Sequence, residues 1–225
     1  MRIIYKDKKI VAIDKPVGMS SESDKSGSVD AMTALSRILS DMGENPRLWL
    51  VHRLDNVTGG LLVFARSKEI AARLSALFSG RETEKEYLAV VEGEAHGGAL
   101  TDYLYKDARQ GKSFVAQRKR AGVKEARLEY RLLDAIETEG GVRSLVRVRL
   151  ATGRHHQIRV QFSSRKHPIV GDGKYGSRDN GYKTPALFSC HLELNMGKER
   201  INVRIMPDIG VYPWSLFAPE KYLFD

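Results

Sequence analysis

The spacing of apolar residues predicts helices in the first part of the chain and strands in the second. Before Gly80, apolar residues recur at helical spacing over 28–43 and 67–80. Each stretch begins with a serine suited to an N-cap and ends at a glycine, as amphipathic helices commonly do. Short apolar runs predict a strand before the first helix, at 10–13, and two strands between the helices, at 49–54 and 61–65. The last run is continuous rather than alternating, which is typical of a buried strand.

Alternation with a period of two dominates the chain after Glu86. Apolar residues alternate over 126–132 and 146–150, and the connection containing Gly140 and Gly141 predicts a hairpin. Further strands are predicted at 87–91, 156–162, 188–193 and 201–205. Early helices and later antiparallel strands predict an α+β fold, in which helices and loops flank a central mixed, mainly antiparallel sheet.

Composition and charge indicate a class of partner for this fold. The 225 residues include 37 Lys and Arg against 28 Asp and Glu, so the formal net charge is +9. A hydrophobic content of 42% is typical of globular proteins and excludes fibrous and disordered classes. The surplus of basic residues favours a nucleic-acid partner, although solubility alone or an anionic membrane surface would also account for it.

Cysteine usage and apolar run lengths indicate the compartment. Cys190 is the single cysteine of the sequence, so no internal disulfide can form. The first residues interleave charged with apolar side chains and lack the apolar core of a signal peptide. The longest apolar runs are far too short to span a bilayer. We therefore expect a soluble cytoplasmic protein with no membrane association.

A polar segment at 52–60 begins at the end of the predicted strand 49–54 and runs into a glycine turn just before the strand 61–65. Loops held by strands commonly carry catalytic groups. In that interpretation Asp55 is a nucleophile or general base, and Arg53 contacts a phosphate or fills a vacated space. In the alternative interpretation, Asp55 and Asn56 only cap the turn, as Asx residues often do.

A second polar segment at 152–161 falls on a predicted strand. With a period of two, His155, Gln157 and Arg159 share one face of it. A cationic Arg159 near a buried carboxylate such as Asp55 would keep that acid ionised, whereas the alternative is a surface strand with a wet polar face. Adjacent histidines on a strand point to opposite faces, and neither HExxH nor a Cys/His pattern is present, so no metal site is expected.

Tyr87, on another strand, is either a core residue or an aromatic platform for a base.

Four segments together resemble the RluA-type family of pseudouridine synthases. HRLDNVTGGLLVFARS is similar to the family's catalytic signature, and GRHHQIRVQFSSRKHPIVGDGKYG to its C-terminal signature. KIVAIDKPVGMS and KEYLAVVEG are similar to its K-P-x-G segment and its tyrosine strand. The histidine before RLD differs from the RsuA-type synthases, where a glycine usually stands. The chain departs from the family pattern at Gly59, where Ser is frequent, at Gln161, where His is common, and at Lys166, where Gly often precedes His-Pro.

The resemblance implies a role for each matching residue. Asp55 would be the catalytic aspartate, and Arg53 would enter the RNA helix where the target uridine leaves it. Tyr87 would pack on the base, and Arg159 would pair with the aspartate. Further substrate contacts are expected from Ile158, which would line the uracil pocket, and from His52 and Thr58.

The resemblance also implies the activity and the organisation of the chain. The expected reaction isomerises specific uridines in structured ribosomal or transfer RNA to pseudouridine, after the base flips out of the helix. It involves no redox or phosphoryl-transfer step, so no cofactor or metal is expected. Residues 1–225 are expected to form one catalytic domain, with two lobes around an active-site cleft. A monomer without an obligatory protein partner is expected.

Many family members carry an N-terminal S4 RNA-binding domain, for which we expect no room before the K-P-x-G segment. RNA recognition would then come from the catalytic domain. Candidate contacts are the stretch 106–124, predicted to be a mobile basic loop or a solvated edge, and the loop 20–28, although both are equally compatible with plain solvated loops.

Two other function classes remain. A non-catalytic RNA chaperone would bind RNA without converting it, but the intact HRLD motif favours an enzyme. A metal-dependent nuclease or hydrolase would lose activity with a chelator.

Overall fold

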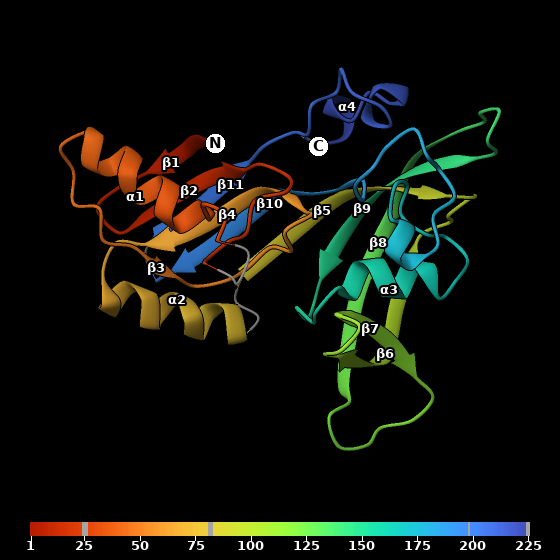
Figure 1. Ribbon diagram of the computed structural model, residues 1–225, viewed down its shortest axis with the longest axis horizontal. Helices are drawn as coiled ribbons and strands as arrows, with labels where there is room; N and C mark the ends of the chain where they lie inside the picture. Colours follow the sequence, from red (N-terminus) through yellow and green to blue (C-terminus); the bar gives the residue numbers. More distant parts are fainter. Residues whose placement is uncertain (24–26, 81–82, 198, 224–225) are drawn as a thin grey trace. The chain divides into compact units, whose positions relative to one another are not determined.

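The computed structural model describes residues 1–23, 27–80, 83–197 and 199–223 (Figure 1). Residues 24–26 of the candidate RNA-contacting loop at 20–28 lie outside the described residues. The chain forms two compact units. Unit 1 contains Met1–Glu84 and Ser189–Ile205, and unit 2 contains Lys85–Phe188 and Met206–Asp225. In the described part of the chain, no helix is long and apolar enough to cross a membrane.

Unit 1 contains a sheet with the strand order β1, β2, β4, β10. β2 pairs antiparallel with both β1 and β4, and the short strand β3 and the strand β11 pair antiparallel with β4 and β10. The bounds are β1 Arg2–Lys6, β2 Ile10–Lys15, β3 Trp49–Leu50, β4 Gly59–Ala65, β10 Leu187–Met196, which belongs to unit 1 from Ser189 on, and β11 Glu199–Arg204. The strands predicted at 10–13, 61–65, 188–193 and 201–205 are therefore confirmed. The strand predicted at 49–54 ends at Leu50, and β1 was not predicted.

Two helices, α1 (Ala31–Asp41) and α2 (Lys68–Gly80), lie against this sheet (Figure 1). Each helix buries leucines on one of its faces. The N-cap of α1 is Asp30 rather than the predicted Ser28, because its carboxylate accepts a hydrogen bond of 2.9 Å from the Thr33 N–H. Gly43 follows the helix with a φ of 72°, as a C′ glycine does. Ser67 accepts from the Ile70 N–H at 3.2 Å and confirms the predicted start of α2.

Unit 2 contains a fully antiparallel series of strands in the order β5, β9, β8, β6, β7. The bounds are β5 Thr83–Glu92, which belongs to unit 2 from Lys85 on, β6 Gly98–Asp107, β7 Lys112–Ala116, β8 Lys124–Ile136 and β9 Arg143–Leu150. The predicted hairpin between β8 and β9 is confirmed. Of the two alternatives predicted for 106–124, the structure supports the solvated edge over the mobile loop, because β7 is the last strand in the order and pairs with the end of β6 through its backbone.

The strand predicted at 156–162 is wrong, because this segment forms the helix α3 (Gln157–Ser163). His156 has a φ of 54°, in the left-handed region, and turns the chain out of an extended path. Its carbonyl then accepts from the Val160 N–H at 3.0 Å. Val160 packs with Leu104, Ala126 and other buried side chains, so tertiary burial overrides the strand preference of a segment rich in β-branched and aromatic residues. The predicted division of this segment into two strand faces therefore does not apply.

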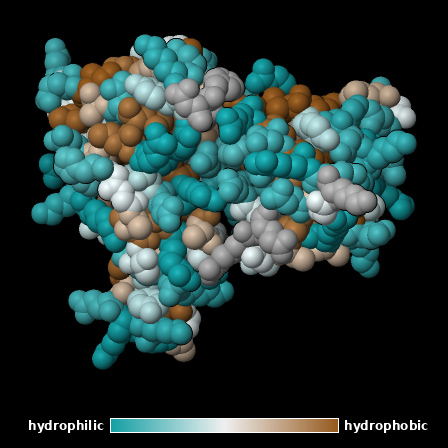
Figure 2. All heavy atoms as spheres, turned by 180° about the vertical axis from the view of Figure 1, so that it is seen from behind, coloured by the Kyte–Doolittle hydropathy of each residue, from teal (hydrophilic) through white to brown (hydrophobic). Residues whose placement is uncertain are grey.

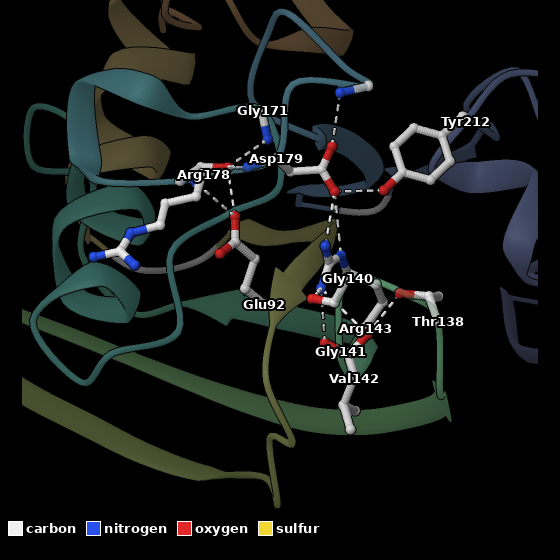
Figure 3. A network of polar contacts seen from close by, with 12 residues as sticks. Glu92, Thr138, Gly140, Gly141, Val142, Arg143, Gly171, Arg178, Asp179 and Tyr212 are labelled. Atoms are coloured by element: carbon white, nitrogen blue, oxygen red, sulfur yellow. Dashed lines mark hydrogen bonds and ion pairs between the residues drawn. The ribbon is translucent and has the colours of Figure 1, made fainter.

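The C-terminal segment of unit 2 is attached to the turn between β8 and β9 by a polar network (Figure 3). Arg143 forms an ion pair of 2.9 Å with Asp179 and donates at 2.9 Å to the Gly140 carbonyl. The Tyr212 hydroxyl donates to the same carboxylate. Burial opposes ionisation, but the hydrogen bonds from Tyr212 and Arg143 hold the pKa of Asp179 below its usual range. Beyond Tyr212 follow η2 (Trp214–Leu216) and the short helix α4 (Glu220–Leu223).

Candidate active site

The segment containing Asp55 connects β3 to β4 in unit 1, and neighbouring groups hold its main chain. The Leu54 N–H donates to Ser21 Oγ at 3.1 Å, and that hydroxyl donates to the Leu54 carbonyl at 3.0 Å. The Thr58 N–H donates to the Asp55 carbonyl at 3.0 Å and closes the turn. Asp55 itself is half-buried. The loop therefore has a fixed backbone beneath its carboxylate.

Lys15, at the end of β2, is a charged residue that contacts this loop and is fully buried. Its ammonium group donates to the carbonyls of Pro16 at 3.0 Å, Met19 at 2.7 Å and Asn56 at 3.3 Å. Burial lowers the pKa of Lys15 to about 8, while Asp55 and Asp14 act in the opposite direction. The same interaction favours the ionised form of Asp55. The sequence analysis quoted Lys15 only as part of K-P-x-G. Its position at the end of an apolar strand was the feature that could have identified it as a buried charge next to the site.

His52, Arg53 and Thr58 lie on the same segment but differ in exposure. His52 Nε2 accepts from the Val63 N–H at 3.0 Å, and its ring lies 4.6 Å from that of Phe78, centroid to centroid. Thr58 is buried. Arg53 is exposed and forms an ion pair of 3.1 Å with Glu22. Of the three predicted substrate contacts, Arg53 is the one at the surface.

Gly60 shows why the segment ends in glycines. Its φ is +109°, and a Cβ there would lie 2.3 Å from the Ser189 carbonyl oxygen of β10. A side chain is thus excluded by both backbone conformation and contact.

Unit 2 carries the other predicted site residues, Tyr87, Ile158 and Arg159. Tyr87 is buried on β5 opposite Val148, and Ile158 and Arg159 are buried in α3. Two hydrogen bonds hold the Arg159 guanidinium on Asp172: Nε to Oδ2 at 2.7 Å and Nη2 to Oδ1 at 2.8 Å. Bidentate pairs of this kind combine strength with a defined orientation. The sequence analysis did not identify this partner of Arg159, although Asp172 stands in the quoted C-terminal signature.

Tyr175, three residues after Asp172, extends this pair into a buried network. The Arg159 guanidinium lies 5.0 Å from the centre of the Tyr175 ring. The Tyr175 hydroxyl accepts from the Ser113 N–H at 2.8 Å and lies 2.9 Å from His156 Nδ1. Tyr175 was quoted in the signature without a role. Its contacts connect Ser113 of β7 and His156, the residue before α3, to η1 (Gly173–Tyr175), whose Tyr175 ring lies against the arginine.

His156 and His155 form a stacked pair with ring centroids 3.7 Å apart. Burial, followed by the positive charges of Arg159, His155, Lys174 and Lys106, lowers the pKa of His156 to about 2. The ring is therefore neutral at physiological pH. Among the residues that the structure describes, no group of three or more His, Cys, Asp or Glu side chains is arranged to hold a metal ion.

Two departures from the family pattern have local explanations. Lys166, at the position where glycine often stands, has a φ of 66°, a left-handed conformation that glycine adopts without strain. Gln161, at the position where histidine is common, donates to Asp102 at 2.7 Å. Neither residue belongs to the network around Arg159, so neither departure removes a predicted catalytic group.

Comparison with known proteins identifies the family. Residues 9–164 match the family described as RNA pseudouridylate synthase. Ribosomal large subunit pseudouridine synthase D of Pseudomonas aeruginosa is 32% identical over 238 residues, which covers 100% of the chain and 70% of that relative. tRNA pseudouridine synthase C of Vibrio parahaemolyticus is 30% identical over 200 residues, 85% of the chain and 80% of that relative.

The fold agrees with these matches. The solved structure of human RNA pseudouridylate synthase domain containing 4 superposes with a TM-score of 0.76 at 24% identity, covering 92% of the chain and 89% of that protein. This neighbour confirms the predicted α+β class, and the sequence matches confirm the resemblance inferred from the motifs. The relatives are named as pseudouridine synthases, which are isomerases acting on RNA. The chain therefore belongs to the RNA pseudouridylate synthase family, in its RluA-type branch.

Proposed function

We propose that this protein isomerises specific uridines of structured ribosomal or transfer RNA to pseudouridine, with Asp55 as the catalytic carboxylate. The observation that carries the proposal is the placement of Asp55 on a loop fixed through its main chain, with the buried Lys15 ammonium as a neighbouring charge. The names of the relatives include ribosomal and transfer RNA, and this supports structured RNA as the substrate class.

The reaction balances without any other reagent. The N1–C1′ bond breaks, the uracil turns, a C5–C1′ bond forms, the proton leaves C5 and a proton is gained at N1. An ionised carboxylate acts in this sequence either as a nucleophile at the sugar or as a base there. Both routes start from the charged form of Asp55, which the positive charge of Lys15 favours. The proposed enzyme works as a cytoplasmic monomer and needs no cofactor, metal ion or protein partner.

The other predicted residues take roles on both sides of this chemistry. The exposed Arg53 would enter the RNA helix when the target nucleotide flips out. Tyr87 would pack on the uracil, Ile158 would line its pocket, and Arg159, oriented by Asp172, would pair with Asp55. For His52 and Thr58 the contacts within unit 1 favour positioning of the loop over contact with RNA.

The test is conversion of uridine in RNA transcribed in vitro, which contains no pseudouridine. Ribosomal and transfer RNA transcripts are incubated with the protein, digested to nucleosides and analysed by chromatography. We expect pseudouridine from the wild type and an activity at least about 10³-fold lower for Asp55→Asn. Asp41→Asn, an exposed carboxylate at the end of α1, is the matched control and should retain activity.

Three outcomes would contradict the proposal. No product from the wild type, with RNA still bound, would favour an RNA chaperone. Undiminished activity of Asp55→Asn would exclude the carboxylate from the chemistry. Loss of activity with a chelator would favour a metal-dependent reaction.

A further inference from the structure

The strands β6 and β7 and the connection to β8 carry most of the net charge of the chain. Residues 106–124, called the basic ribbon below, contain seven Lys and Arg residues and one carboxylate, a net +6 out of the total +9. That carboxylate, Asp107, accepts from the N–H groups of Arg109 and Gln110 at 2.9 and 3.0 Å and forms the turn between β6 and β7. It is therefore used locally and does not neutralise the ribbon.

The cations of the ribbon differ from other cations of unit 2. The arginines outside the ribbon that pair with aspartates include Arg143, Arg159 and Arg165. In the ribbon, six basic side chains are exposed, and none forms an ion pair with a described carboxylate: Lys106, Arg109, Arg118, Lys119, Arg120 and Lys124. Like charges held together at a surface repel one another, so they indicate an anionic partner rather than a structural role.

Two aromatic rings lie among these cations. Tyr105 of β6 and Phe114 of β7 are cross-strand neighbours whose ring centroids are 5.4 Å apart with an interplanar angle of 23°. Arg120 lies over the Tyr105 ring at 5.7 Å, and Lys112 over the Phe114 ring at 5.5 Å. Both rings are half-buried. Flat aromatic faces next to cations are the combination that binds unstacked bases and phosphates.

The surface of the ribbon favours a polar ligand over a lipid bilayer. Figure 2 shows mainly hydrophilic side chains over the end of unit 2 that carries β6 and β7, at the lower left of that view. Among the described ribbon residues, Val115 is the one large hydrophobic side chain that is exposed. A surface that inserts into a membrane would present several such side chains.

We propose that the basic ribbon is the docking surface for the RNA substrate, with phosphates on the six exposed cations and an unstacked base on the Tyr105–Phe114 pair. This inference rests on the proposed function for the identity of the RNA. It assigns the ribbon to substrate binding and not to the chemistry at the uridine.

The first experiment separates the position of the charge from its amount. Arg118→Gln, Lys119→Gln and Arg120→Gln are combined in one variant. The matched control combines Lys8→Gln, Arg37→Gln and Lys68→Gln, three exposed cations of unit 1.

Binding to an in vitro transcribed ribosomal RNA fragment is measured as a function of salt concentration. We expect about tenfold weaker binding for the ribbon variant, and a slope of log K against log salt that is smaller by about 2, since each lost contact to single-stranded RNA removes about 0.7. The control should bind within about twofold of the wild type.

The second experiment tests the aromatic pair. Tyr105→Leu with Phe114→Leu retains apolar side chains but removes the flat rings. We expect about tenfold weaker binding of single-stranded RNA with an unchanged salt slope, because no phosphate contact is lost. A purely structural role would instead lower the midpoint of urea unfolding and leave RNA affinity unchanged below that midpoint.

The outcomes distinguish this inference from the proposed function. A ribbon variant that matches the control in RNA affinity and salt slope would overturn the inference, even if the wild type makes pseudouridine. Binding of phosphatidylglycerol vesicles that the ribbon variant loses while keeping its RNA affinity would overturn it in favour of a membrane. Ribbon-dependent RNA binding by a wild type that makes no pseudouridine would support the docking surface and refute the proposed function.

Discussion

The two groups of site residues are held in different ways. In unit 1, the loop of Asp55 is fastened through main-chain groups: Lys15 donates to the Asn56 carbonyl, and Ser21 bonds both backbone groups of Leu54. In unit 2, the side chain of the predicted site residue is itself held, because Asp172 engages two nitrogens of Arg159. The carboxylate of unit 1 stays half-buried, whereas both members of the unit 2 pair are buried.

This difference decides how much a predicted site side chain contributes to the stability of each unit. Where the main chain is held, a site side chain can be replaced with little effect on stability. Where the side chain is held in a buried ion pair, removal of one partner leaves an uncompensated charge. Substitutions in the two units should therefore differ in their effect on stability, even where both reduce activity.

The largest expected effect tests this difference directly. Asp172→Asn should lower the free energy of unfolding by about 3 kcal/mol, because Arg159 keeps its charge without a buried counterion. Asp55→Asn should lower it by less than about 1 kcal/mol, because that side chain is half-buried and its backbone contacts remain. Urea unfolding monitored by circular dichroism measures both. Equal losses for the two variants would contradict the comparison.

A smaller effect is expected from the residue that holds the main chain in unit 1. Lys15→Met should destabilise the protein by about 2 kcal/mol, because the carbonyls of Pro16, Met19 and Asn56 lose a charged donor. The net loss is moderated because the buried ammonium, whose pKa is lowered to about 8, is removed as well. Lys8→Met, at an exposed position, is the control and should change stability by no more than about 0.5 kcal/mol. A Lys15→Met protein as stable as the control would show that the loop does not depend on this lysine.

A pH dependence of stability is expected from unit 2. Burial lowers the pKa of His156 to about 2 in the folded protein, against an ordinary value of 6.5. Between these values the unfolded chain binds a proton that the folded protein does not, so stability decreases as the pH falls below about 6.5. One proton contributes at most about 1.4 kcal/mol per pH unit. Asparagine tolerates the left-handed φ of this position. The variant His156→Asn should therefore reduce the slope of the unfolding free energy against pH between pH 4.5 and 6.5. An unchanged slope would mean that His156 titrates alike in both states.

Local patterns predicted most of the secondary structure. Helical spacing located α1 and α2, and alternation with a glycine connection located the β8–β9 hairpin, because these signals depend on neighbours in sequence. The errors occurred where partners distant in sequence decide. The segment 157–163 has the composition of a strand, yet burial against Leu104 and Ala126 makes it a helix. The residues of β7 show little periodicity of apolar positions, and the strand is defined by its backbone pairing with β6.

The sequence by itself determined the family and the candidate residues of this protein. The HRLD segment, the C-terminal signature and the surplus of basic residues are properties of residue identity and order. The tertiary structure decided how those residues are held: Lys15 on three carbonyls, His52 on β4, and Arg159 on Asp172. A hydrogen bond or an ion pair depends on distance and direction in space, and spacing along the chain does not determine either once the chain has turned.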